Sequence, residues 1–89
     1  MGGIDVNQAN NEEVTPLFMA CQEGHSKIVE MLVAVDGILV NQATNEEATP
    51  LYIACQNGHS KVVEMLLAVD GIQVNQVTSS SAVPNLVNT

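Results

Sequence analysis

The chain has 89 residues, and its ten acidic against two basic side chains give a net charge of −8 at pH 7. This charge opposes binding to the phosphate backbone of nucleic acids and to anionic membrane surfaces. One Phe, one Tyr and no Trp indicate an aliphatic core, which suits thin packed helices better than two broad sheets. Neither a basic, apolar leader nor an apolar run of roughly 18 residues occurs, so we expect an intracellular, cytoplasmic protein.

An internal repeat with a period of 34 residues dominates the sequence. Segments 15–42 and 49–76 differ at six positions, so that 22 of 28 residues are identical. A period between roughly 20 and 50 residues predicts a solenoid, whose units cannot bury their own apolar faces alone.

The first predicted helix of the unit spans about 16–23. Thr15 is a suitable N-cap, Pro16 suits the first helical position, and Gly24 ends the helix. Such a short helix is not stable alone in water and must be held by neighbouring elements.

A second helix is predicted from His25 to about Val35, and it is apolar on most of its circumference. A turn at 36–37 ends it, and a short extended run at 38–41 leads to the tip of a turn at 45–47. The second copy of the unit follows the same plan, with helices at about 50–57 and 60–69.

The unit resembles the ankyrin repeat in its Thr-Pro-Leu opening, its Ala-Cys-x-x-Gly-His hinge, its Val-Val-Glu-Met-Leu-Leu helix and the Val-Asn that follows. The tetratricopeptide repeat has the same period, but its Trp, Leu-Gly and Tyr signature is absent. The resemblance covers about residues 3–76. It implies an all-α repeat solenoid of helix-turn-helix pairs joined by extended hairpin loops, which we call fingers.

The phase of the repeat divides the chain into two full repeats with partial flanking units. We expect a partial repeat tail with the first finger at 1–14, ankyrin repeats at 15–48 and 49–76, and a degenerate partial repeat or disordered tail at 77–89. The chain therefore resembles a short section of an array. With only two complete helix pairs, we expect it to be marginally stable as an isolated monomer.

Two departures from the family pattern concern the fingers. Phe18 and Tyr52 replace the usual His after Thr-Pro-Leu, and Glu13 and Glu47 replace the usual Gly at the tip. A left-handed backbone at these glutamates costs on the order of 1 kcal/mol each relative to Gly, so we expect a looser or differently shaped tip.

The last helix carries no polar cap. Val63, Leu66 and Leu67 are as apolar as their counterparts in the first repeat, although no full repeat follows to cover them. We expect exposed apolar surface here, which makes self-association through the uncapped ends possible.

Chemistry-bearing residues give no catalytic, metal or cofactor site. Cys21 and Cys55 occupy equivalent helix positions, too far apart for a disulfide if stacked helices lie about 8–10 Å apart. Each cysteine with His25 or His59 supplies only two of the four ligands of a structural zinc site, and a glycine breaks the helix between them. The paired glutamates at the fingers are solvated turn residues. We expect a protein that is not an enzyme.

The resemblance implies a protein-interaction module that binds through its finger tips and the concave face of the first helices. The implied partner-binding positions are Asn11, Glu12, Glu13, Val14, Gln22, Glu23, Asn45, Glu46, Glu47, Ala48, Gln56 and Asn57. This set contains five acidic side chains and no basic one, which favours a basic or polar protein partner. The alternative is a structural segment of a longer ankyrin array with no binding role of its own.

Overall fold

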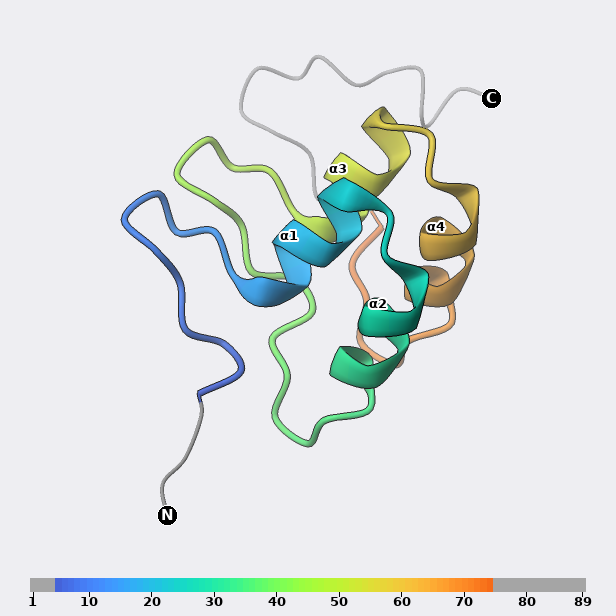
Figure 1. Ribbon diagram of the computed structural model, residues 1–89, viewed down its shortest axis with the longest axis horizontal. Helices are drawn as coiled ribbons and strands as arrows, with labels where there is room; N and C mark the ends of the chain where they lie inside the picture. The colour runs from blue at the N-terminus through green and yellow to red at the C-terminus, as the bar shows by residue number, and fades with distance from the viewer. Residues whose placement is uncertain (1–4, 75–89) are drawn as a thin grey trace.

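The computed structural model describes residues 5–74, which form four helices and no strand (Figure 1). The helices are α1 (Pro16–Glu23), α2 (Ser26–Val33), α3 (Pro50–Gln56) and α4 (Ser60–Leu67). Pair α1–α2 stacks on pair α3–α4, with α1 against α3 and α2 against α4. Both fingers project from the same side of the stack, next to the inner helices α1 and α3. The predicted all-helical repeat architecture is confirmed, whereas the segment predicted at 77–89 lies outside the described residues.

The inner helices begin as their sequence predicts. Thr15 Oγ1 accepts a hydrogen bond of 3.1 Å from the Phe18 N–H, and Thr49 Oγ1 accepts one of 3.1 Å from the Tyr52 N–H. A proline follows each threonine at the first helical position. The two N-caps therefore fix both inner helices at the same point of the repeat.

The outer helices end two residues earlier than predicted, α2 at Val33 and α4 at Leu67. After α2, the Val35 N–H donates to the Leu32 carbonyl at 3.0 Å, and the Ile38 N–H donates to the Val35 carbonyl at 3.2 Å. These i to i−3 bonds tighten the chain into a turn that Gly37 completes at a φ of 86°. The apolar run continues beyond the helix, which is why its sequence suggested a longer one.

The core lies between the two helix pairs. Leu17, Cys21 and Val29 of the first repeat and Val62 and Leu66 of the second are at most 1% exposed. Because both repeats contribute to one apolar layer, neither can bury its own face alone.

The burial of Leu66 corrects one prediction at the last helix. Leu66 is fully buried, Val63 is partly buried, and Leu67 alone of the three is largely exposed, at 51%. The reason is that α4 packs on both α2 and α3, and the spacing of four residues places Leu66 on the same buried stripe as Val62.

Asparagine side chains connect successive repeats. Asn7 Nδ2 donates to the Gly37 carbonyl at 3.1 Å, while Asn7 Oδ1 accepts from the Leu39 N–H at 2.9 Å. Asn41 forms the same pair of bonds, both of 2.9 Å, with residues 71 and 73. These clamps hold the loops after the outer helices in register.

Candidate protein-binding groove

Each finger is closed by a polar side chain at its base. Asn10 Oδ1 accepts hydrogen bonds from the N–H groups of Glu12 and Val14, at 2.8 and 3.0 Å. In the second finger, Thr44 Oγ1 accepts from the N–H groups two and four residues later, at 3.2 and 3.3 Å. Backbone bonds between Asn10 and Val14 and between Thr44 and Ala48 complete the closure.

The glutamates at the two finger tips adopt a left-handed backbone conformation. Glu13 has a φ of 64° and Glu47 a φ of 67°. The Glu13 N–H donates to the Asn10 carbonyl at 2.9 Å, and the Glu47 N–H donates to the Thr44 carbonyl at 2.8 Å. Both tips are therefore closed turns held by the side chain at position 10 or 44, so the looser of the two expected forms, looser or differently shaped, is not the one found.

The two fingers are also joined to one another. The Asn45 N–H donates to the Glu12 carbonyl at 3.0 Å, and Asn45 Nδ2 donates to the Asn11 carbonyl at 3.3 Å. The fingers thus form one wall that faces the inner helices.

A groove of about 650 Å³ lies between this wall and helices α1 and α3. We call it the concave groove. It is lined by Asn10, Glu12, Val14, Phe18, Met19, Gln22, Thr44, Asn45, Glu46, Ala48, Tyr52, Ile53 and Gln56.

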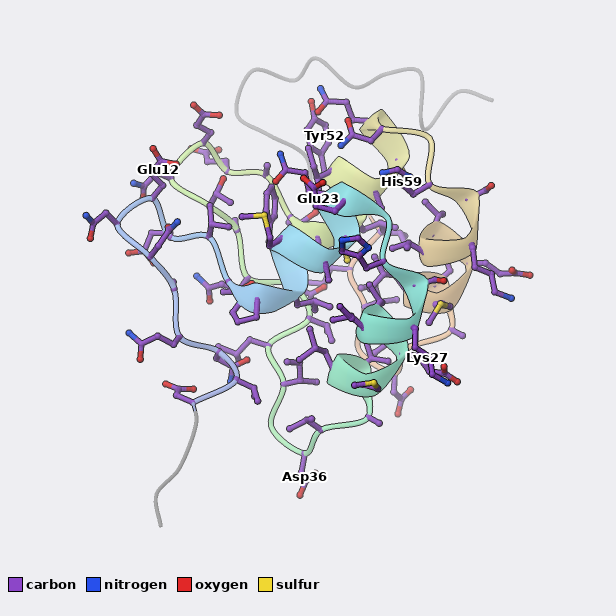
Figure 2. All side chains as sticks on the ribbon, viewed as in Figure 1. Glu12, Glu23, Lys27, Asp36, Tyr52 and His59 are labelled. Carbon is purple, nitrogen blue, oxygen red and sulfur yellow. The ribbon has the colours of Figure 1, made fainter. Side chains whose placement is uncertain are left out.

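The rim of the concave groove is acidic and rich in amides. Glu12 and Glu46 are both exposed. The only two basic side chains of the chain, Lys27 and Lys61, lie on the outer helices, where each pairs with a glutamate three residues later at 3.6 and 3.9 Å. Figure 2 shows Glu12 at the end of the first finger and Lys27 on the opposite side of the molecule. The groove therefore carries negative charge without a basic side chain.

The floor of the concave groove is apolar. Phe18 and Ile53 are 6% and 8% exposed, whereas Met19 is 45% exposed and Tyr52 is partly buried. A flexible thioether next to an aromatic ring is an adaptable surface for an apolar side chain of a partner.

The structure brings seven of the twelve implied binding residues together in the groove. They are Glu12, Val14, Gln22, Asn45, Glu46, Ala48 and Gln56. Ala48 is only 9% exposed, so it shapes the wall. The other five, Asn11, Glu13, Glu23, Glu47 and Asn57, are exposed but do not line the groove.

The side chain of one of these five residues donates a hydrogen bond within the molecule. Asn57 Nδ2 donates to the Gln22 carbonyl at 3.1 Å, and His59 Nε2 lies 2.9 Å from the same oxygen. Because a carbonyl oxygen only accepts, Nε2 carries the proton of this imidazole. Both side chains tie the hinge of the second repeat to α1.

Sequence reasoning missed six lining residues. Asn10 and Thr44 close the fingers. The sequence signal that could have indicated them is a polar residue four positions before the end of each finger. Phe18, Met19, Tyr52 and Ile53 form the floor. Helical spacing could have found them, because positions three and four residues before Gln22 or Gln56 share a helix face with these glutamines.

The remaining chemistry-bearing groups do not face the groove. Both thiols are free; burial raises the pKa of Cys21 to about 12 and also raises the pKa of the partly buried Cys55. Within residues 5–74, no three metal-ligating side chains lie together. In the same range, no helix is long and apolar enough to cross a membrane.

Comparisons with known proteins agree with the repeat architecture. A family model of three ankyrin repeats matches residues 1–78. The crystal structure of the human ASB11 ankyrin repeat domain is similar with a TM-score of 0.67 and 37% sequence identity, over 73% of this chain. The match spans 29% of the length of that domain. No curated protein matches the chain.

Proposed function

Because the chain belongs to the ankyrin-repeat family, whose members are generally non-catalytic protein-interaction modules, we propose that it binds a protein partner through the concave groove. The observation that carries the proposal is the lining of this groove. Two glutamates and several amides surround an apolar floor that contains the exposed Met19, and both lysines lie on the outer helices.

The partner that fits this lining is a basic segment with an apolar side chain. Glu12 and Glu46 are equivalent positions of successive repeats. Packed helices lie about 8–10 Å apart, and this distance corresponds to about three residues of extended chain at about 3.3 Å each. A segment with two cationic residues three positions apart, and with an apolar residue between them that contacts Met19, matches the groove. Complementary charge raises the association rate and excludes acidic segments.

Charge reversal of the fingers tests this proposal. The variant E12K/E13K/E46K/E47K removes the acidic rim, and E30K/E64K/D36K/D70K makes the same change of charge away from the groove. Peptides are selected from a random library displayed on phage, first on the unaltered chain and then on each variant. We expect the unaltered chain and the second variant to enrich basic peptides, and the first variant to lose this enrichment by at least tenfold. Equal enrichment on all three proteins would refute the proposal.

The runner-up function is a structural segment of a longer array. Apolar side chains at the two ends of the stack favour it, because Ile28 is 45% exposed and Leu67 is 51% exposed. The same selection separates the two functions. A groove without a binding role selects no consensus peptide on any of the three proteins.

A further inference from the structure

The two ends of the helix stack are not equivalent to its middle, although the residues there are nearly the same. At the first end, Ile28 is 45% exposed while its counterpart Val62 is 1% exposed, and Met31 is 58% exposed while its counterpart Met65 is partly buried. We call the surface formed by Ile28, Met31 and the exposed His25 the leading face.

The opposite end shows the complementary pattern. Leu67 is 51% exposed while its counterpart Val33 is partly buried, and Val63 and Cys55 are partly exposed while Val29 and Cys21 are fully buried. We call the surface formed by Cys55, Val63 and Leu67 the trailing face.

The contact inside the molecule shows what covers such faces. Inside the molecule, the second repeat covers the surface of the first repeat that is equivalent to the trailing face. It does so with its own equivalent of the leading face, with α3 packed on α1 and α4 packed on α2. Polar groups match there as well, because the Gln22 carbonyl meets Asn57 and His59. The two exposed end faces are therefore equivalent to the two surfaces that already pack together between the repeats.

We propose that a second copy of this chain docks head to tail, with the leading face of one copy on the trailing face of the other. The contact joins two different surfaces, so each added copy presents a further free face, and the assembly grows as an open chain. The charge of −8 on each copy opposes the association, which therefore strengthens as salt screens the repulsion.

One residue makes this contact weaker than the internal one. Where Asn57 donates to the Gln22 carbonyl, the leading face has Glu23, whose carboxylate cannot donate to the equivalent Gln56 carbonyl. Glu23→Asn restores the donor. One additional hydrogen bond of ordinary net strength tightens association by about three- to tenfold.

Sedimentation velocity between about 10 μM and about 1 mM, the range of weak association, tests the proposal. Ile28→Glu places a charge on the leading face and Leu67→Glu places one on the trailing face, and both side chains are already about half exposed. Leu39→Glu is the control, because Leu39 and its counterpart Gln73 are both exposed. Circular dichroism of each variant verifies that its helices are retained.

We expect the unaltered chain and Leu39→Glu to associate further as concentration and salt rise, and Ile28→Glu and Leu67→Glu to remain monomeric when each is alone. An equimolar mixture of Ile28→Glu and Leu67→Glu should form dimers that do not grow. The reason is that the mixture retains one intact trailing face, on Ile28→Glu, and one intact leading face, on Leu67→Glu. Glu23→Asn associates more tightly. A monomeric unaltered chain at about 1 mM, or a mixture that does not dimerise, would overturn the proposal.

Discussion

At the scale of single residues, Gly24 of the first repeat lies directly against the His59 ring of the second. A Cβ atom on Gly24 would lie 2.7 Å from Nδ1 of the His59 ring, and the φ of Gly24 is 75°. Gly58 is the equivalent position of the second repeat, with a φ of 74°, and no described atom lies within 4 Å of its added Cβ. The two glycines therefore share a left-handed backbone, in which any Cβ atom is strained, and differ in packing.

Alanine at each glycine separates these two effects. We expect Gly58→Ala to lower the free energy of unfolding by about 1 kcal/mol, through strain alone. Gly24→Ala should cost about 1–3 kcal/mol more, because the methyl group displaces His59 from the Gln22 carbonyl. Thermal unfolding of both variants, each also combined with His59→Ala, measures the difference. The extra cost should disappear without the imidazole; an equal cost at the two glycines would contradict a packing role for this ring.

At the scale of structural elements, the helix starts and the end of α1 at Gly24 were predictable from the sequence, and the ends of the outer helices were not. Thr15 accepts a hydrogen bond from the Phe18 N–H, and Pro16 occupies the first helical position. Both act within the first helical turn, so their effect can be predicted from the local sequence. The end of α2 depends on where the chain tightens into i to i−3 bonds before Gly37, and the apolar run to Val35 gives no sign of it. The fingers show the same limit. Their closed shape comes from side-chain acceptors at positions 10 and 44, whose geometry the sequence does not specify.

The finger tips carry a strain that substitution should relieve. Glu13 and Glu47 have φ values of 64° and 67°, in a region that costs a residue with a Cβ atom about 1 kcal/mol. We expect Glu13→Gly and Glu47→Gly each to raise the free energy of unfolding by up to about 1 kcal/mol, reduced by the greater freedom of Gly in the unfolded chain. Glu12→Gly is the matched control, because Glu12 is not among the residues with positive φ, and it should destabilise by about 0.5–1 kcal/mol. Chemical unfolding measures all three; destabilisation at position 13 equal to that at position 12 would rule out the strain.

At the scale of the whole molecule, burial is set by the neighbouring repeat rather than by residue type. Met31 and Met65 are identical side chains at equivalent positions of the two repeats, yet the first is 58% exposed and the second is partly buried. The sequence predicts the repeat. It does not indicate which of two equivalent apolar residues a neighbouring unit covers. The apolar floor of the concave groove was missed for a different reason, because helical spacing from Gln22 and Gln56 does indicate it.

The stability of the whole chain should therefore depend on whether its end faces are covered. The described core is one layer between two helix pairs, so at about 5 μM we expect urea unfolding with a midpoint below about 3 M. Association of the folded form stabilises it by mass action, so the midpoint should rise with protein concentration. Ile28→Glu should abolish this rise, and Leu39→Glu should retain it. Circular dichroism at increasing urea measures each midpoint. A cooperative transition with a midpoint well above about 3 M at the lowest concentration would show that two repeats bury enough apolar surface to be stable without a neighbour.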